Sequence, residues 1–431
     1  MITVARVMLW GDFVGAVLWD EASGMASFEY DRAFLSKGLD ISPIQMPITA
    51  PRIYSFGGLS RDSFMGLPGL LADSLPDAYG KAMLDRWLAF NSRTAANPVE
   101  RLCYQANRSM GALEFEPAQR IIENDSEQIE IASLVEVARQ VLEHKKELHV
   151  DFGDNATQSI STIISVGTSA GGARAKAVIA FNEQTGDVRS GQIAAPEGYS
   201  HWLLKLDGVT NSALGDPKFY GLIEYAYYRM ATAAGINMTE SRILQEGNRS
   251  HFMTRRFDRI GANEKLHTQT LCGLAHFDYR MPRAYSYEQL FEVMRRLKLP
   301  YNQQEQMYRR MIFNVVGRNQ DDHTKNVSFL MNPRGEWSLS PAYDVSWAYN
   351  PVGEWTSRHQ MSINNKWNDI TRADLIEFAR RSDIDKPTEI IEQVADAVSL
   401  WPQIATELSI PAPQIDAIEK TLRLEIQSNS F

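Results

Sequence analysis

Strand-like and helix-like segments are segregated along this chain, and their order limits the possible folds more than any other feature. The first fifty residues have the alternation of a β-meander, and strand-like runs return at 160–166, 175–181 and 201–207, separated by Gly-rich turns. Beyond them most of the chain has helical periodicity. Runs of strands followed by runs of helices predict an α+β protein.

Turn residues place the first strands. Gly11-Asp12 separates two apolar runs, as in a β-hairpin, and a second turn at Glu21–Gly24 precedes the run MASFEYD. After Pro76 the pattern becomes helical, and three apolar residues recur on one face. These are Leu84, Trp87 and Leu88.

Capping residues and helix-stop residues indicate the later helices. Ser133 and Glu136 match an S-x-x-E capping box at the start of a helix over 133–146, and Ser286 and Gln289 repeat the pattern. The other expected helices run from Asp216-Pro217 to Gly235, over 303–316 up to Gly317, and through the final sixty residues, where we expect two or three, the first capped by Thr371.

Length sets the number of structural units. A chain of 431 residues is too long for one simple core and long enough for two or three units. We expect an N-terminal β-rich subdomain over 1–110, a strand-rich lobe over 111–260 and a helical lobe over 261–431.

Composition argues against several classes of protein. No apolar run is long enough to cross a bilayer, and Asp12 interrupts an apolar start that lacks a small-residue cleavage site. Cys103 and Cys272 cannot form a disulfide scaffold or a four-cysteine zinc site, so a reducing cytoplasm fits best. The net charge of −9 predicts little affinity of the isolated chain for duplex DNA.

A glycine-rich loop, SVGTSAGGARAKAV at 165–178, separates two expected strands. Gly171 and Gly172 would let backbone amides approach a phosphate, and Lys176 could add a positive charge. The loop is not a Walker A motif, because Ala173 stands where that motif requires lysine, and it does not match the G-x-G-x-x-G of protein kinases. A hairpin loop without a ligand explains this segment equally well.

A lysine interrupts the apolar strand HWLLKLDG. Lys205 must be paired or must face a ligand if it is buried, because burying a bare charge is costly. In protein kinases a strand lysine downstream of the glycine loop binds the α- and β-phosphates of ATP. The alternative is a lysine at an exposed strand edge.

The segment NQDDHTKN, at 319–326, concentrates polar groups between two hydrophobic segments. Asp321 and Asn326 have the D-x-x-x-x-N spacing of the kinase catalytic loop, in which Asp accepts the substrate proton and Asn holds magnesium. Asp344, in SPAYDVSW, has the position of the second metal-binding Asp, although Tyr343-Asp344-Val345 is not D-F-G. The order of glycine loop, strand lysine, D-x-x-x-x-N and later Asp favours a kinase.

A metal-dependent hydrolase is the alternative for the same segment. Asp321, Asp322 and His323 are metal-ligating residue types, but adjacent side chains would point in different directions. No H-E-x-x-H or paired-histidine motif supports this hypothesis. We expect His323 to brace the loop by hydrogen bonding.

Several motifs together resemble those of HipA-family serine/threonine kinases: GTSAGGARAKA, WLLKLDG, TRRFDR at 254–259, NQDDHTKN and SPAYDVSW. The N-terminal meander with GLPGLLADSLPDAYG is similar to the extra N-terminal subdomain of that family. The resemblance implies a two-lobed protein-kinase-like fold with an N-terminal β-rich subdomain and a helical C-terminal lobe. It also implies ATP and Mg²⁺ as cofactors.

The resemblance also implies roles for individual residues. Asp321 would be the catalytic acid–base residue, with Asn326 and Asp344 as magnesium ligands. Ser169 falls on the autophosphorylated serine of the family, with Ser165 and Thr168 as neighbouring alternatives. The residues implied to bind ATP are Gly171, Gly172, Lys176, Lys205, Arg255, Phe257, His323 and Asn326.

The family comprises toxins of type II toxin–antitoxin systems, associated with persistence. A member would transfer the ATP γ-phosphoryl group to a protein, as an ATP-dependent protein serine/threonine kinase (EC 2.7.11.1), and autophosphorylation would inhibit it. The best-known target is glutamyl-tRNA synthetase, an aminoacyl-tRNA synthetase, and the partner is a helix-turn-helix antitoxin of HipB type through which the toxin reaches DNA. The alternative is a catalytically silent, kinase-shaped corepressor that binds an antitoxin on operator DNA.

Overall fold

The computed structural model describes residues 2–49, 53–93, 95–119, 129–143, 174–192, 194–209, 219–261 and 263–427. The chain divides into two compact units. Unit 1 comprises residues 1–218, 242–269 and 330–336, and unit 2 comprises 219–241, 270–329 and 337–431. The domain boundaries predicted at 110 and 260 stay predictions.

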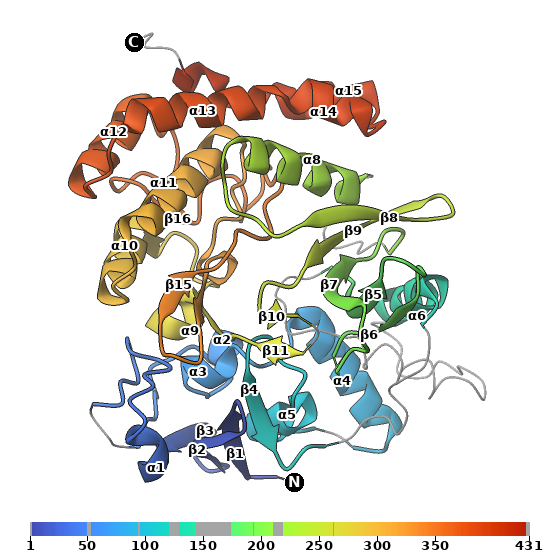
Figure 1. Ribbon diagram of the computed structural model, residues 1–431, viewed down its shortest axis with the longest axis vertical. Coiled ribbons are helices and arrows are strands. Elements are labelled where there is room, and N and C mark those ends of the chain that lie inside the picture. The colour runs from blue at the N-terminus through green and yellow to red at the C-terminus, as the bar shows by residue number, and fades with distance from the viewer. Residues whose placement is uncertain are drawn as a thin grey trace. The chain divides into compact units, whose positions relative to one another are not determined.

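Unit 1 begins with an antiparallel sheet in the strand order β3-β2-β1-β4 (Figure 1). Its strands are β1 (Val4–Leu9), β2 (Asp12–Asp20), β3 (Met25–Tyr30) and β4 (Leu113–Glu116). Leu9 lies opposite Asp12 in the first hairpin, and Asp20 lies opposite Met25 in the second. The second predicted turn is therefore confirmed, and the first lies one residue earlier than predicted, at Trp10-Gly11, because Asp12 already pairs in β2.

The helices that follow β3 in unit 1, before β4, include the one expected after Pro76. The helices are α1 (Arg32–Leu35), α2 (Arg61–Phe64), α3 (Gly69–Ala72), α4 (Ala78–Phe90) and α5 (Pro98–Gln105). The Asp77 carboxylate caps α4 by accepting a hydrogen bond from the Gly80 amide at 2.7 Å. Leu84, Trp87 and Leu88 pack in one cluster, which confirms the predicted apolar face.

The helix predicted over 133–146 begins earlier than its capping pattern suggested. Helix α6 spans Ile131–Glu143, so Ser133 lies inside the first turn and is not the N-cap. Glu136 instead forms an ion pair with Arg139 one turn later. The reason is the anchoring of the preceding segment, because the Ile129 amide donates to the Val188 carbonyl at 2.8 Å and fixes the entry of the chain two residues before the helix. Residues 144–146 lie outside the described residues.

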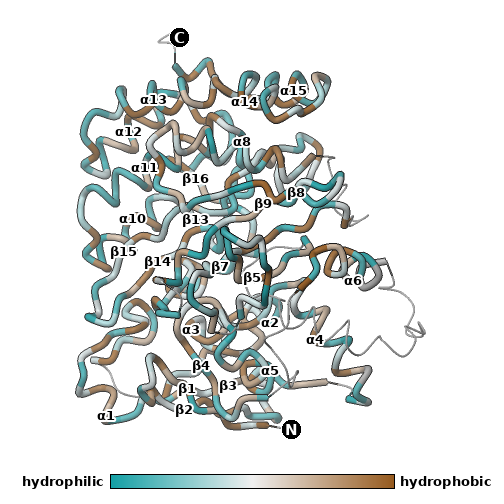
Figure 2. The backbone as a smooth tube through the Cα atoms, turned by 45° about the vertical axis from the view of Figure 1, so that its right-hand side comes forward, coloured by the Kyte–Doolittle hydropathy of each residue, from teal (hydrophilic) through white to brown (hydrophobic). Residues whose placement is uncertain are grey.

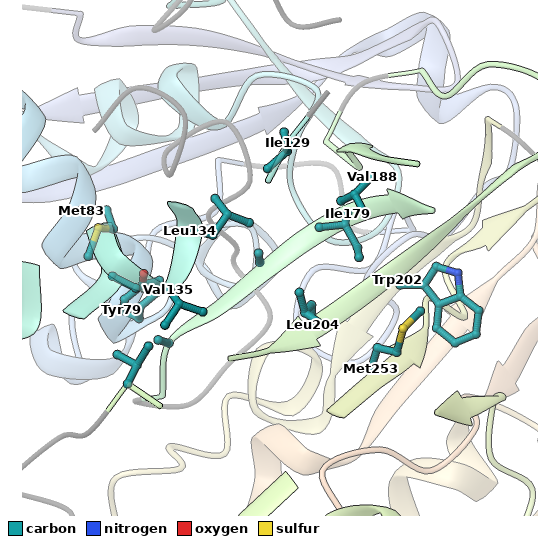
Figure 3. Packing of buried hydrophobic residues seen from close by; sticks show 14 residues of the cluster. Tyr79, Met83, Ile129, Leu134, Val135, Ile179, Val188, Trp202, Leu204 and Met253 are labelled. Atoms are coloured by element: carbon teal, nitrogen blue, oxygen red, sulfur yellow. The ribbon is translucent and has the colours of Figure 1, made fainter. Parts of the chain in front are cut away.

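A second sheet of unit 1 has five strands in the order β6-β5-β7-β9-β8. They are β5 (Lys176–Asn182), β6 (Val188–Ser190), β7 (Tyr199–Lys205), β8 (Ser241–Glu246) and β9 (Arg249–Arg255). Two of the strand-like runs expected from the sequence are confirmed as β5 and β7, and the third, 160–166, lies outside the described residues. Apolar side chains of β5, β7 and β9 pack with α4 and α6 in one buried cluster (Figure 3).

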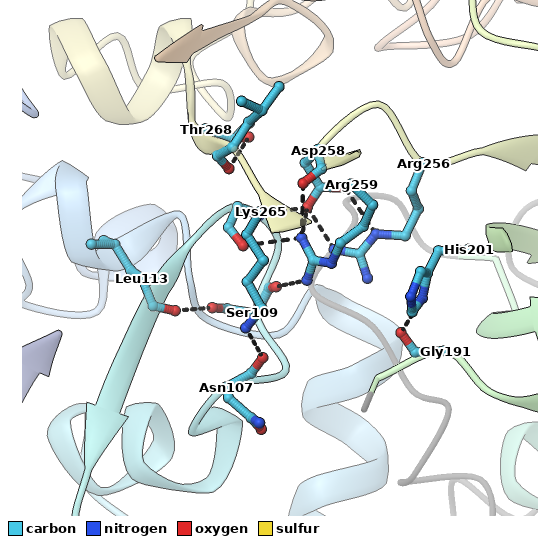
Figure 4. A network of polar contacts seen from close by, with 12 residues as sticks. Asn107, Ser109, Leu113, Gly191, His201, Arg256, Asp258, Arg259, Lys265 and Thr268 are labelled. Atoms are coloured by element: carbon cyan, nitrogen blue, oxygen red, sulfur yellow. Dashed lines mark hydrogen bonds and ion pairs between the residues drawn. The ribbon is translucent and has the colours of Figure 1, made fainter. Parts of the chain in front are cut away.

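A buried ion network stabilises the junction of residues 109–114 with the hairpin β10 (Arg259–Ile260) and β11 (Glu264–Lys265) (Figure 4). The Asp258 carboxylate is fully buried and accepts hydrogen bonds from Arg256 at 2.6 Å, from Arg259 at 2.7 Å and from the Gly111 amide at 2.7 Å. Although burial alone would raise the pKa of Asp258, the two guanidinium groups hold it far below its usual range.

Unit 2 is mostly helical. Its α-helices are α8 (Tyr220–Ala233), α9 (Leu271–Ala275), α10 (Tyr287–Arg296), α11 (Tyr301–Val316), α12 (Arg372–Arg381), α13 (Pro387–Ser399), α14 (Trp401–Glu407) and α15 (Ala412–Glu419). Its remaining elements are β13 (Tyr285–Ser286), β15 (Trp337–Leu339), β16 (Met361–Ser362) and the 3₁₀ turns η1 (Thr324–Asn326) and η2 (Leu424–Gln427). Two further strands, β12 (His267–Thr270) and β14 (Ser328–Met331), contain residues of both units.

The caps predicted for this unit are confirmed, but its last segment has more helices than expected. Ser286 and Thr371 both form complete capping boxes, at the starts of α10 and α12. The described part of the final sixty residues contains four α-helices, α12 to α15, where two or three were predicted. Hydrophilic and hydrophobic residues alternate along these helices (Figure 2). In the core of the unit, Tyr227 of α8 contacts Phe313 of α11 and Trp401 of α14.

In the described residues no helix is long and apolar enough to span a membrane. Cys103 and Cys272 are both buried and carry free thiols.

Candidate functional site

The polar segment 319–326 forms a turn fixed at the end of α11. The Gly317 amide closes that helix on the Phe313 carbonyl at 2.8 Å, and the Asn319 amide reaches back to the Asn314 carbonyl at 3.0 Å. The turn ends in the 3₁₀ element η1, where the His323 ring accepts a hydrogen bond from the Lys325 amide at 3.3 Å. His323 therefore braces the turn, as predicted from the sequence.

The turn brings Asp321 and Asn326 together. The Nδ2 atom of Asn326 donates to the Asp321 carbonyl at 2.9 Å, and the Asn326 amide donates to the His323 carbonyl at 2.9 Å. With Nδ2 engaged, the Oδ1 oxygen of Asn326 is the atom left to meet a cation or a polar ligand. The D-x-x-x-x-N spacing thus has a defined geometry.

Asp344 lies on a second segment that is linked to this turn. The Tyr343 hydroxyl donates to the Lys325 carbonyl at 2.6 Å and lies 2.5 Å from the Ser328 hydroxyl. Asp344 itself has left-handed backbone geometry, with φ of 54°. Sequence reasoning found Asp344 but missed the Tyr343 link, because no motif reports a hydroxyl-to-backbone contact between distant segments.

A pocket within unit 2 is lined by polar residues of both segments, including His323, Asn326 and Asp344. A carboxylate and an amide oxygen are hard oxygen ligands of the kind that Mg²⁺ accepts, with phosphates and water completing the shell. Groups of three or more His, Cys, Asp or Glu residues suited to a metal ion are absent from the described residues. These two donors fit a magnesium ion that binds together with a nucleotide. They do not make up a metal site built from protein ligands alone.

Asp321 is the acidic group that faces outward from the turn. Its side chain is 38% exposed. Partial burial raises the pKa of Asp321, His323 opposes this, and the neighbouring Asp344 carboxylate raises the pKa further. The indole of Trp355 donates to Oδ1 of Asp321 at 2.6 Å.

Asp322 has a different environment from its neighbour. Its buried carboxylate accepts hydrogen bonds from the Tyr287 hydroxyl at 2.8 Å, the His359 ring at 2.9 Å and the Gln360 amide at 2.7 Å. Because three donors already satisfy it, Asp322 is a brace for the turn rather than a metal ligand beside Asp321. This arrangement disfavours the hydrolase hypothesis. His359 and Gln360 carry no motif, so the sequence offered no signal for them.

Unit 1 contains the strand lysines. Lys176 and Lys205 are register partners on β5 and β7. The Lys176 ammonium is buried and lies 2.9 Å from the Asp77 carboxylate, while the Lys205 ammonium lies 5.8 Å from the centre of the Phe252 ring. In this structure Lys176 is therefore held by a carboxylate, and its role toward a nucleotide stays a prediction.

The remaining candidate residues are partly outside the described residues. Arg255 is exposed at the end of β9, opposite Trp202 on β7, and Phe257 is half-buried two residues later. Gly171, Gly172 and Ser169, with the alternatives Ser165 and Thr168, lie outside the described residues, so their proposed roles remain predictions.

Comparison with known proteins gives consistent results. Residues 5–116 match the HipA N-terminal domain, and residues 168–401 match the HipA-like C-terminal domain. A Haemophilus influenzae protein named "Putative kinase" is 23% identical over 231 residues, which are 46% of this chain and 67% of that protein. A chain in the Shewanella oneidensis complex of HipA, HipB and operator DNA superposes with a TM-score of 0.66 at 16% identity, over 99% of this chain and 100% of that one. This likeness confirms the predicted α+β fold of two-lobed, kinase-like type.

Proposed function

The chain belongs to the HipA family, and we propose that it is an ATP-dependent protein serine/threonine kinase. One observation supports this most directly: the hydrogen bond from the Asn326 side chain to the Asp321 backbone, which places both residues of a D-x-x-x-x-N motif on the same turn. Asp344 lines the same pocket as Asn326. A kinase requires a catalytic-loop Asp and Asn followed by a later metal-binding Asp, and these three residues occur in that order.

The proposed reaction is phosphoryl transfer from ATP to a protein hydroxyl. Asp321 orients the acceptor hydroxyl and accepts its proton while the hydroxyl oxygen attacks the γ-phosphorus and ADP leaves. Asn326 and Asp344 would hold a magnesium ion, which neutralises charge on the phosphates when bound. Lys205, with Lys176, would pair with the phosphates, and the backbone from Arg255 to Phe257 would meet the adenine. Catalysis then consists mainly of positioning and charge neutralisation.

The proposed partners follow from the family. The Shewanella relative forms a complex with HipB and operator DNA, so we propose a helix-turn-helix antitoxin of HipB type as the route by which this chain reaches DNA. Its net charge of −9 supports an indirect route, because duplex DNA repels a negatively charged protein. An aminoacyl-tRNA synthetase such as glutamyl-tRNA synthetase is the proposed class of target.

Incubation with ATP and magnesium tests the function. We expect intact-mass measurement to show one added phosphate, mapped to 165–174 with Ser169 as the site, and phosphopeptide mapping of bacterial extract to show a serine or threonine target. The added phosphate carries almost two negative charges at neutral pH, which would repel the ATP phosphates and inhibit the enzyme. A protein that turns over no ATP, yet alters operator binding by a HipB-type antitoxin, would instead support the corepressor alternative.

The link between Tyr343 and Lys325 gives a second prediction. A Tyr343→Phe substitution removes the hydroxyl that joins the Asp344 segment to the Asn326 turn at 2.6 Å, and the two proposed metal ligands lose their fixed separation. The Kd for ATP in the presence of magnesium should rise roughly 5- to 10-fold, as expected for one lost hydrogen bond. Isothermal titration calorimetry measures this change.

Tyr308→Phe is the matched control, because the Tyr308 hydroxyl donates to the Leu375 carbonyl at 3.0 Å in the helical core. It should alter stability and leave the Kd for ATP unchanged. Equal ATP affinity in the wild-type and Tyr343→Phe proteins would contradict the proposed role of the link.

A further inference from the structure

The proposed proton acceptor is itself held by a tryptophan from another segment. The Nε1–H group of Trp355 donates to Oδ1 of Asp321 at 2.6 Å. The indole also lies nearly edge-on to the His323 ring, with centroids 6.3 Å apart. Trp355 lies outside every motif considered above, so its position beside Asp321 is a finding of the structure.

The segment that carries Trp355 is attached to the catalytic turn by separate bonds. The Gln360 side chain donates to the Trp355 carbonyl, and the Gln360 amide donates to Asp322 at 2.7 Å. The His359 ring donates to the same carboxylate at 2.9 Å. The backbone that carries the indole is therefore held beside the turn by contacts other than the indole's own bond to Asp321.

The bond occupies one of the two carboxylate oxygens. In the described part of the chain no hydrogen bond is found to Oδ2 of Asp321, and the side chain is 38% exposed, so this oxygen remains accessible. A short hydrogen bond to a charged acceptor is strong and directional. It holds the carboxylate in one rotamer, whereas a free Asp side chain would sample several.

We propose that Trp355 is a positioning residue for phosphoryl transfer, whose indole fixes Asp321 so that Oδ2 meets the acceptor hydroxyl. This inference rests on the proposed kinase function. In the step itself the hydroxyl proton passes to Oδ2 as the hydroxyl oxygen bonds to the γ-phosphorus. The bond from that phosphorus to the bridging oxygen breaks, and ADP leaves with the electron pair.

Trp355→Phe tests the proposal because it keeps an aromatic ring and removes the N–H donor. The readout is transfer of radiolabelled phosphate from ATP to bacterial extract proteins, measured over a range of ATP concentrations. The maximal rate should fall roughly 10- to 100-fold, the range expected when a reacting group is misplaced. The KM for ATP should change by less than about twofold, because the indole acts on the acceptor side of the reaction.

Trp401→Phe is the matched control. The Trp401 indole donates to the Ile415 carbonyl at 3.1 Å, so the same chemical change is made in the same unit without a contact to Asp321. This control should keep the wild-type rate. If Trp355→Phe does not fold by circular dichroism, replacing the Trp355 indole with the isosteric benzothiophene removes the N–H alone and carries the same expectation.

The outcomes separate this inference from the proposed function. A wild-type protein that transfers no phosphate overturns both. An active wild-type protein with an equally active Trp355→Phe variant overturns the role of Trp355 alone. A faster Trp355→Phe variant overturns it as well, since the indole would then obstruct the acceptor hydroxyl.

Discussion

An Asp321→Asn variant should lose phosphoryl transfer by roughly 100- to 10,000-fold, the range that general base catalysis contributes. Asparagine has the shape of aspartate but cannot accept the hydroxyl proton. Its Oδ1 atom can still accept the Trp355 N–H bond that wild-type Asp321 accepts at 2.6 Å. The turn should therefore keep its structure, and the loss should appear in the chemical step.

The measurement is phosphate transfer from radiolabelled ATP at saturating magnesium, together with thermal unfolding of the same samples. Asp416→Asn makes the same chemical change at an exposed position of α15 and should be fully active. The Asp321→Asn protein should have a melting temperature close to that of the wild type. Transfer at the wild-type rate by this variant would rule out Asp321 as the proton acceptor.

An Asp258→Ala variant should lose about 3–5 kcal/mol of unfolding free energy, the typical cost of removing one partner of a buried ion pair. Asp258 is fully buried, and its loss removes the carboxylate that is paired with the guanidinium groups of both Arg256 and Arg259. The Gly111 amide also loses its acceptor. Urea unfolding followed by tryptophan fluorescence measures the change.

The matched control is the exposed pair of Arg334 and Glu336 in the same unit, at 78% and 61% side-chain exposure. Glu336→Ala should lower the urea midpoint only slightly, because water already solvates both charges. A similarly small loss for Asp258→Ala would contradict the importance of the buried network.

The same network gives a pH dependence whose sign can be stated. The pKa of Asp258 is depressed in the folded state, so its stabilising contribution is fully present above the unfolded pKa, near 3.8. That contribution is lost progressively as the pH falls below this value toward the folded pKa. Below about pH 4, the urea midpoint of the wild type should therefore decrease more steeply with falling pH than the midpoint of Asp258→Asn, in which the side-chain amide does not titrate.

Local elements could be predicted from the sequence because their determinants lie within a few residues. The first hairpin and the capping boxes at Ser286 and Thr371 depend on turn and cap chemistry alone. The start of α6 could not be read in the same way. The segment just before α6 is held by a hydrogen bond from the Ile129 amide to the Val188 carbonyl, and Val188 lies on a strand far along the sequence.

The residues of the candidate site also differ in whether a local pattern could predict them. Asp321, Asn326 and Asp344 were found because their spacing is part of a motif. The residues that hold them were not, because Tyr343, Trp355 and His359 act through contacts between segments that no short pattern records. Lys176 is a further case: its place in a motif predicted a phosphate contact, which stays a prediction, and gave no sign of its buried partner Asp77.

The Asp258 network also affects which fragments of this chain, and which chimaeras with relatives, can fold. Strand β4 completes the N-terminal sheet by pairing with β1, and the segment just before it carries the Gly111 amide bound to Asp258. A fragment ending at residue 110 would therefore lack an edge strand. The remainder would lose the Ser109 carbonyl that accepts a hydrogen bond from Arg259 and the Asn107 carbonyl that accepts one from Lys265. An N-terminal segment exchanged between relatives should therefore fold best when the hairpin at 256–265 is exchanged with it, because the two segments share these buried contacts.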